Sequence, residues 1–501
     1  MLTIFAPTNL WPQIEAILAQ EERLHELITL QDSQAPATQP SFPALLVTEQ
    51  YIALPLAWSQ ALPPYLLPDD WAFNADNLLG LIFHLLENDP KAYQYLHHHP
   101  AYLDLEYQNH LKYQLPLATD LETRANYQGL HNQAVLLHYG HFDRTRPPGD
   151  PVASYEAALQ VAPDVEHEAF TARELASLWL DLQQLTQAEA LLTRTLELPL
   201  SQEANMALRL LRSKIWMQQL VVPYEEAQVE RLKSEIWALL VHHENTGEML
   251  QVGLLLLDAT HLASLSHSYA EALGYAKRSL EIFEDEGIAE LAAQAQLAKG
   301  TLLATWAQND QPQFYKPAVE SYQAALKVFT KERAPGVFAD IHHRLGVLYA
   351  EMPAENKRRA IWAGVASASF QEALEFYTKE QYPYEYASIC NNFANAYTQF
   401  PPAIHSDNHV KALHYYQEAL EIRSAAYPYE RAITLLNYLE ASWNAGNDES
   451  SFNQARFDDM KAKANEVKAL VQAPEMVATA DEHLKNLDQL QEAFQNDRID
   501  A

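Results

Sequence analysis

Small and aromatic residues recur at helical spacing through much of the chain. Three segments can be laid over one another almost without adjustment: Tyr322-Gln323-Ala324-Ala325-Leu326, Phe370-Gln371-Glu372-Ala373-Leu374 and Tyr416-Gln417-Glu418-Ala419-Leu420. An alanine stands four residues before each aromatic residue, at Ala318, Ala366 and Ala412. Spacings of four and three residues place these side chains on one face of an α-helix. The pattern predicts helices whose small residues let a neighbour approach closely while the aromatic ring fills the space beside it.

Looser copies extend this pattern toward the N-terminus. Tyr155-Glu156-Ala157-Ala158-Leu159 has the same order of residues. Further copies have alanine in the first position and end in a small or polar residue: Ala188 to Thr195, Ala227 to Ser234 and Ala272 to Ser279. A fixed pattern repeated along a chain indicates a stack of similar units.

A second kind of helix is predicted before each of these. It has a Leu-Gly or Leu-Ala type pair followed three residues later by a large residue: Leu345-Gly346 with Tyr349, Phe393-Ala394 with Tyr397, Leu175-Ala176 with Trp179, and Lys299-Gly300 with Leu303. The pairing of the two helix types resembles the tetratricopeptide repeat, over roughly residues 121–446 and about seven repeats. The resemblance implies an all-α solenoid of helical hairpins that winds into a right-handed superhelix.

The repeats are longer than the usual tetratricopeptide unit. Successive copies lie about 37 to 48 residues apart, whereas the typical repeat has 34. The extra residues fall mostly between the two helices of a repeat, as at 352–356 and 401–406. We interpret the chain as a long-repeat, bacterial type of the family. Proline begins corresponding helices at Pro335, Pro383 and Pro428, where its missing N–H costs no hydrogen bond.

Both ends of the chain lack the repeat. Within residues 1–115 we predict helices over Leu10–Leu30 and Asn74–Glu87, a linker over 31–43, and a short strand or hairpin within 45–56. This segment is either a small separate domain or an N-terminal cap. Residues 449–501 predict two amphipathic helices broken at Ala473-Pro474. We expect them to cap the array, since a terminal repeat exposes an apolar face.

The net charge argues against some classes of binding partner, and the composition bears on the location of the protein. The formal net charge of −32 repels phosphate backbones and anionic lipids, so we expect neither nucleic acid nor a membrane as partner. It would steer a basic partner toward the chain, although it could equally serve solubility alone. One cysteine, Cys390, permits a reducing compartment. The first residues lack the basic start of a secretory signal, so the expected location is the cytoplasm.

The sequence offers little catalytic chemistry. No phosphate-binding glycine loop and no Gly-x-Ser-x-Gly motif occurs, and His167-Glu168 lacks the second histidine of a zinc protease because Thr171 stands there. Histidine clusters at 97–99, 138–143 and 405–409 could bind zinc or nickel, or could be solvated surface residues. None forms a closed set of four ligands. We predict no enzyme activity, no metal and no cofactor, with Cys390 in the core.

The resemblance also implies a place for a ligand. In the family, the first helix of each repeat lines a concave groove where extended peptides or partner helices dock. The matching positions here are Asp340, His343, Asn391, Asn395, Glu440 and Trp443. Asparagine can donate to and accept from a peptide backbone, and a tryptophan can anchor an apolar side chain. Asp340 and Glu440 hint at a basic segment. The alternative is that these are ordinary exposed residues or are covered by the C-terminal helices.

These observations favour a protein–protein interaction scaffold or adaptor that binds a partner protein or peptide in the groove. The alternative is a regulatory sensor, in which a bound peptide or ligand changes the pitch of the superhelix. An enzyme with its site in residues 1–115 is the third hypothesis. Repeat architectures provide large surfaces and few enclosed pockets, which favours binding over catalysis. The sequence leaves the partner and the oligomeric state open.

Overall fold

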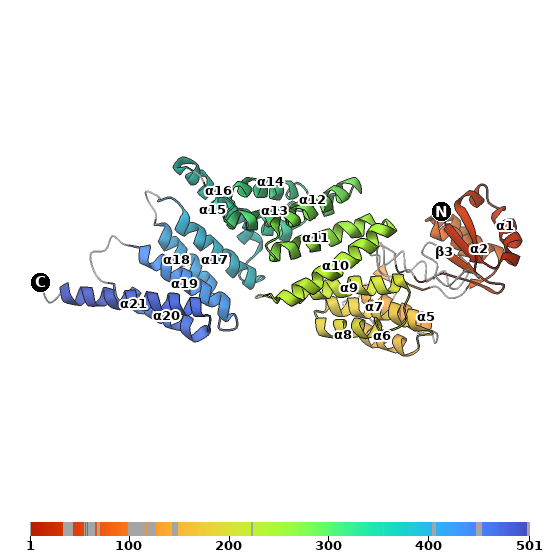
Figure 1. Ribbon diagram of the computed structural model, residues 1–501, viewed down its shortest axis with the longest axis horizontal. Coiled ribbons are helices and arrows are strands. Elements are labelled where there is room, and N and C mark those ends of the chain that lie inside the picture. Colours follow the sequence, from red (N-terminus) through yellow and green to blue (C-terminus); the bar gives the residue numbers. More distant parts are fainter. Residues whose placement is uncertain are drawn as a thin grey trace. The chain divides into compact units, whose positions relative to one another are not determined.

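The structure, a computed structural model, divides into two compact units, Met1–Asn245 and Thr246–Ala501, which are described separately. It describes residues 2–33, 44–54, 56, 58, 66–67, 71–98, 116–117, 127–142, 149–221, 224–353, 355–402, 407–446 and 453–497. Most of these residues are helical, and in Figure 1 the helices lie as antiparallel neighbours within each unit. None of the helices in these ranges is long and apolar enough to cross a membrane.

The first unit begins with a small mixed sheet. Its five strands are β1 (Leu2–Ala6), β2 (Ile28–Asp32), β3 (Ala44–Val47), β4 (Tyr51–Ala53) and β5 (Trp71–Ala72), in the order β2-β1-β3-β4-β5. β1 is parallel to β2 and β3, whereas β3, β4 and β5 are antiparallel. The predicted strand or hairpin within 45–56 is confirmed as β3 and β4. The sheet gives the first unit a small mixed α/β part ahead of the helices of the repeat.

The helix predicted over Leu10–Leu30 is wrong in its second half. The chain forms η1 (Thr8–Leu10), α1 (Trp11–Leu18) and η2 (Leu24–Leu27) before β2. Arg23 has a left-handed φ of 63°, which ends any continuous helix there. The β-branched residues Ile28 and Thr29 favour the strand that follows. α1 thus belongs to the crossover that two parallel strands require.

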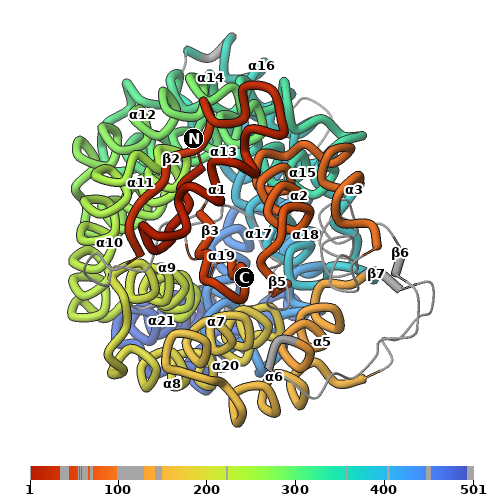
Figure 2. The backbone as a smooth tube through the Cα atoms, turned by 90° about the vertical axis from the view of Figure 1, so that its right-hand side faces the viewer, coloured from red at the N-terminus to blue at the C-terminus, as the bar shows by residue number. Residues whose placement is uncertain are grey.

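The sheet has its own core. Alternate residues of β1, namely Leu2, Ile4 and Ala6, are fully buried, as one covered face of a strand requires. They pack with apolar side chains of α1, α2 (Ala75–Leu85) and α3 (Asp89–Leu96). Figure 2 shows α1 and α2 beside the strands. The helix predicted at 74–87 is confirmed by α2, whose N-cap Asn74 accepts a hydrogen bond from the Asn77 N–H.

Helices of the repeat follow in both units. In the first unit they are α5 (Tyr127–Tyr139), α6 (Pro151–Gln160), α7 (Val165–Asp181), α8 (Leu185–Thr195), α9 (Gln202–Gln218) and α10 (Glu226–Thr246, its last residue beyond the unit boundary). The short strands β6 (Pro116–Leu117) and β7 (His141–Phe142) pair beside them. Helices α5 and α6 pack as a hairpin, and so do α7 and α8, while α5, α7 and α9 contact one another in turn.

The second unit continues with longer hairpins. Its helices are α11 (Met249–Leu265), α12 (Tyr269–Asp285), α13 (Ala289–Gln308), η3 (Pro312–Phe314), α14 (Tyr315–Ala325), α15 (Pro335–Glu351), α16 (Asn356–Phe376), α17 (Pro383–Gln399), α18 (Asn408–Ile422), α19 (Pro428–Asn444), α20 (Gln454–Leu470) and α21 (Pro474–Asp497). Odd-numbered helices from α11 to α17 each pack against the next even-numbered one. α20 packs against α19 in the same way, and α21 contacts both, so α21 is the helix that covers the end.

The predicted packing of small residues against aromatic rings is confirmed. The triads of α14, α16 and α18 are all buried: Ala318, Tyr322 and Ala325; Ala366, Phe370 and Ala373; Ala412, Tyr416 and Ala419. A Cβ added at Gly346 would lie 2.9 Å from the Phe370 ring, and one at Gly300 would lie 2.8 Å from Tyr322. Such distances leave no room for a larger residue. The glycine of the first helix therefore receives the aromatic ring of the second.

One looser copy of the pattern is wrong. Ala227 and Ser234 are exposed on α10. The buried residues there include Leu232, Ile236 and Leu239, which have the spacing of four and three but stand five residues later. Alanine alone carried the prediction, and alanine is a good helix former on exposed faces as well.

Successive hairpins of the second unit are also joined by repeated ion pairs. Lys331, in the turn before α15, contacts Glu372 at 2.9 Å and Glu375 at 2.6 Å on α16. Lys379, in the turn before α17, contacts Glu418 at 3.1 Å and also pairs with Glu421 on α18. Exposed pairs of this kind contribute little each. Their recurrence at matching places confirms the phase of the repeats, and the structure is a tetratricopeptide-like array of helical hairpins.

The first unit contains a segment that leaves the sheet and returns to it. Four of the described residues between β4 and β5, namely Leu56, Trp58, Leu66 and Leu67, are here called the β4–β5 segment. They are buried in the same core as residues of α5, α6, α7 and α8 rather than in the core of the sheet. Residues before and after position 115 therefore share one hydrophobic core, which the predicted division at 115–121 did not anticipate.

Candidate functional site

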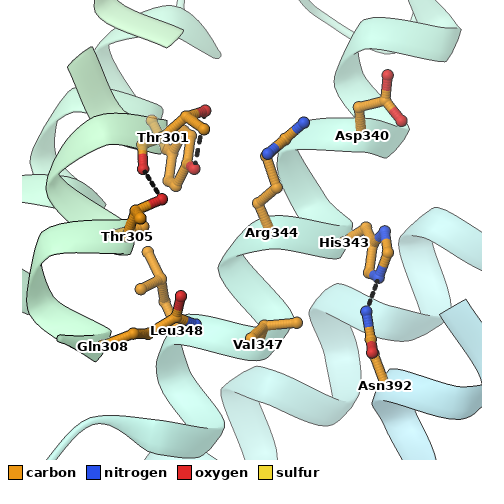
Figure 3. A pocket seen from close by; sticks show the side chains of 11 residues that line it. Thr301, Thr305, Gln308, Asp340, His343, Arg344, Val347, Leu348 and Asn392 are labelled. Atoms are coloured by element: carbon orange, nitrogen blue, oxygen red, sulfur yellow. Dashed lines mark hydrogen bonds between the residues drawn. The ribbon is translucent and has the colours of Figure 1, made fainter. Parts of the chain in front are cut away.

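A pocket opens among the first helices of consecutive hairpins in the second unit. Helix α15 contacts both α13 and α17. The pocket has a volume of about 260 Å³ and is lined by Thr301, Ala304, Thr305 and Gln308 of α13, Tyr322 of α14, Asp340, His343, Arg344, Val347 and Leu348 of α15, and Asn392 of α17. Figure 3 shows Asp340, His343 and Arg344 projecting from α15. The lining is mostly polar, with one carboxylate and one guanidinium.

Two of the predicted site residues lie in this pocket. The Asp340 carboxylate accepts a hydrogen bond of 2.8 Å from the Tyr377 hydroxyl. The Asn392 amide nitrogen lies 2.9 Å from Nε2 of His343 (Figure 3), so the amide donates to the ring and links α17 to α15. His343 is half-buried and Asp340 is exposed. The structure therefore brings together Asp340 and His343 with a residue that the sequence did not single out, Asn392.

The two predicted asparagines of α17 lie elsewhere. Asn391 is buried, with only 6% of its surface exposed. The Oδ1 atom of Asn395 accepts a hydrogen bond of 2.6 Å from Tyr416 of α18, so this side chain links the two helices of one hairpin. Asn392 corresponds in the repeat to Arg344, since each directly precedes the large residue of its Leu-Gly or Phe-Ala pair. Aligning the position before Leu345 and Phe393 would have identified both pocket residues.

The two predicted residues of α19 are outside the pocket. Glu440 is exposed. Trp443 is half-buried, and its Nε1–H donates a 2.9 Å hydrogen bond to Nδ1 of His483 on α21. The two rings are stacked with an angle of 13° between their planes. The C-terminal helix thus contacts the tryptophan that was expected to anchor a ligand, and that role for Trp443 stays a prediction.

Burial sets the charge of the pocket. It lowers the pKa of His343 to about 4, and the nearby Arg344 guanidinium lowers it further. Burial also raises the pKa of the Tyr322 hydroxyl. Histidine and tyrosine are therefore both neutral near pH 7, and the pocket offers hydrogen bonds beside a single opposed pair of charges, Asp340 and Arg344.

Replacing His343 by glutamine is expected to reduce the loss of stability in acid. The unfolded chain binds a proton on this histidine below the ordinary pKa of 6.5, whereas the folded chain binds it only near 4, so stability falls as pH drops between these values. Glutamine keeps an acceptor for Asn392 and does not titrate. Urea unfolding midpoints at about pH 7 and about pH 5 should differ less in His343→Gln than in the parent. The exposed His25→Gln is the control, and an equal difference in both variants contradicts the prediction.

Across the ranges that the structure describes, no three His, Cys, Asp or Glu side chains converge in a way that could hold a metal ion. His99, Asp143 and His405, which complete the three predicted clusters, lie outside the described residues. Asp407 is the N-cap of α18 and accepts from the backbone of His409. Cys390 is buried, which raises its thiol pKa to about 12, as a core residue requires.

The chain has similarities of low sequence identity to solved structures. No family model and no curated protein matches the chain. Among solved structures, a signal transduction ATPase of the STAND class with a tetratricopeptide repeat sensor, from Pyrococcus horikoshii, is similar at 15% identity and a TM-score of 0.46, over 67% of this chain and 46% of that one. This chain thus spans about half the length of that protein. A Rap protein complexed with competence and sporulation factor has 14% identity and a TM-score of 0.39, over 69% and 87% of the two chains. The human IFIT1 dimer with m7Gppp-AAAA has 14% identity and a TM-score of 0.41, over 82% and 81%.

Proposed function

We propose that this protein is an interaction scaffold whose first helices bind an extended segment of a partner protein. The observation that supports this most directly is a contact within the chain itself. The β4–β5 segment packs on α5 and α7, which are first helices of their hairpins. The Asn132 side chain of α5 accepts a 2.7 Å hydrogen bond from the Leu67 N–H and donates one of 2.6 Å to the Leu67 carbonyl. One asparagine thus satisfies both backbone groups of one residue.

An aromatic anchor accompanies this backbone contact. The Trp58 ring meets Phe170 of α7 edge to face with 5.0 Å between centroids. The Arg173 guanidinium lies 5.2 Å from the centroid of the Trp58 ring, within the range of a cation–π contact. Arg173 and His343 each stand two residues before the leucine of a Leu-Gly or Leu-Ala pair. The same position of the repeat therefore contacts the β4–β5 segment in the first unit and lines the pocket in the second.

The pocket residues provide the chemistry for a similar contact. Asn392 and Gln308 carry amides that can donate to and accept from a peptide backbone, and Thr305 carries a hydroxyl. Arg344 is exposed and could pair with a carboxylate of the bound segment. A basic segment, which Asp340 and Glu440 had suggested, remains an untested alternative. In the proposed mechanism a partner segment lies across α13, α15 and α17, with hydrogen bonds holding its backbone.

Selection from a displayed library of random peptides tests the proposal. A peptide enriched on the full-length protein should lose at least about tenfold in affinity on Arg344→Ala/Gln308→Ala, about 1.4 kcal/mol, in fluorescence anisotropy. Both side chains are exposed, so the fold should be retained. Lys316→Ala on the second helix α14, also exposed, is the control and should bind as the parent does. Unchanged affinity of the double variant would exclude the pocket as the site.

The sensor hypothesis predicts a different radius of gyration for the complex with the selected peptide. A passive scaffold keeps its radius of gyration when the selected peptide binds, whereas a sensor should change it in small-angle scattering. The described contacts support the binding of a segment on the first helices and do not bear on a change of radius, and we therefore propose the scaffold alone.

A further inference from the structure

Two consecutive turns of the second unit present exposed tyrosines at corresponding places. The sequence Tyr-Pro-Tyr-Glu occurs at 382–385, where α17 begins, and again at 427–430, where α19 begins. Four side chains are exposed by 37% to 52% of their surface: Tyr382, Tyr384, Tyr427 and Tyr429. We call these four residues the tyrosine edge. They lie outside the pocket described above.

The rings of the tyrosine edge connect one turn to the next. Tyr384 and Tyr427 have their ring centroids 5.5 Å apart with 51° between the planes, although 43 positions separate them in the chain (427 − 384). Tyr382 stacks on Phe376 with 5.1 Å between centroids, which fixes that end of the row. The contact between Tyr384 and Tyr427 thus joins the aromatic surfaces of the two turns into one strip.

The fold does not require these tyrosines. The turn before α15 has the same place in the repeat and reads Ala334-Pro335-Gly336, and its helix begins at the proline as α17 and α19 do. Single exposed aromatic residues are common on protein surfaces. Exposed rings at matching positions of two neighbouring turns, in contact with each other, form a patch of the kind that marks an interaction site.

Glutamates adjoin the tyrosines in the sequence, and the basic residues of the same turns bond to other groups. Glu380 and Glu385 are exposed in the first turn, and among the described residues neither has an ion pair. Lys379 is paired with glutamates of α18. Arg423 is buried and donates 2.6 Å and 3.3 Å hydrogen bonds to the Thr434 hydroxyl and the Glu430 carbonyl. The strip therefore offers aromatic faces together with the exposed carboxylates of Glu380 and Glu385.

We propose that the tyrosine edge binds an extended, arginine-containing segment of a partner protein. A guanidinium lies flat on an aromatic face and pairs through two N–H groups with a carboxylate, so it matches both features of the strip. Lysine has no planar face and forms neither contact as well. This surface is separate from the pocket of the proposed function, and neither proposal depends on the other.

A pair of short labelled peptides provides the test. One alternates arginine with glycine, and the other has lysine at every arginine position. On the full-length protein at about 0.15 M salt, where the Debye length is about 8 Å, the arginine peptide should bind several-fold more tightly in fluorescence anisotropy. Its affinity should fall at least about tenfold on Tyr384→Ala/Tyr427→Ala and should stay within about twofold on Tyr384→Phe/Tyr427→Phe, which keeps both rings.

Three outcomes overturn the proposal. Equal binding of the two peptides, or undiminished binding to the alanine variant, means that the net charge of −32 attracts any cation. Loss of binding on Arg344→Ala/Gln308→Ala places the peptide in the pocket instead. Circular dichroism of the alanine variant should match that of the parent. If it does not, the affinity of Tyr384→Ala alone decides. This variant has a small residue where the preceding repeat has Gly336.

Discussion

Replacing Asn132 by alanine is expected to destabilise the first unit by about 2–6 kcal/mol. The Leu67 N–H and carbonyl are buried and both bond to this one side chain. Alanine would leave the two groups without partners, and each buried unsatisfied group costs about 1–3 kcal/mol. The Trp58 ring, which lies against Phe170, should become more exposed as the β4–β5 segment loosens. Urea unfolding followed by tryptophan fluorescence measures both effects on the full-length chain.

The chain offers a matched control for this substitution. Asn9 is exposed and donates a 3.2 Å hydrogen bond to Glu49, so Asn9→Ala should change stability by no more than about 0.5 kcal/mol. Asn132→Asp keeps the acceptor for the Leu67 N–H but loses the donor to its carbonyl, and it should be destabilised as well. If Asn132→Ala unfolds at the same urea concentration as Asn9→Ala, the segment is not held by this asparagine.

Phe370→Ala is expected to cost about 3–5 kcal/mol in the second unit, the usual range for removing a fully buried phenylalanine. The ring fills the space over Gly346 and stacks on Phe393 of the next hairpin with 4.7 Å between centroids. Its loss therefore opens a cavity between two hairpins as well as within one. The measurement is the urea midpoint of the helical signal in circular dichroism.

Two variants distinguish this packing from a general effect of losing an aromatic residue. Phe376 lies on the same helix and is only half-buried, so Phe376→Ala should cost clearly less. Gly346→Val should be destabilised from the opposite side of the contact, because even a Cβ there would lie 2.9 Å from the ring. A glycine substitution without effect would show that the hairpin tolerates a wider spacing than the structure has.

The hairpins could be predicted because their signal repeats. Each triad such as Ala318, Tyr322 and Ala325 is a weak indication by itself, but in-phase copies identify the buried face and, through Gly300 and Gly346, the partner helix. The pattern failed at Ala227, where no aromatic residue supported the alanine. The boundary between α1 and β2 was missed for another reason. The apolar residues of Leu10–Leu30 fit helical spacing, and the left-handed turn at Arg23 has no strong sequence signal.

The site was predicted less completely than the fold. Asp340 and His343 line the pocket, whereas Asn391 lies outside it and the next residue, Asn392, lines it. One residue on a helix is a rotation of 100°. That rotation decides between a buried side chain and one that faces the pocket. The contact between Trp443 and His483 could not be derived either, because helix spacing within α19 does not specify where α21 packs. Contacts between distant segments are set by tertiary packing, which local patterns do not encode.

The β4–β5 segment determines whether the N-terminal sheet can be separated from the first hairpins. The chain leaves the sheet after β4, contributes Trp58 and Leu67 to the core of α5 and α7, and returns to the sheet at β5. The backbone therefore passes from the sheet to the first hairpins before the β4–β5 segment and back to the sheet after it. A recombination event that exchanged residues 1–115 for a foreign domain would remove part of the hairpins' own interior. The N-terminal segment and these hairpins therefore form one structural piece, whereas each later hairpin packs chiefly on its neighbours.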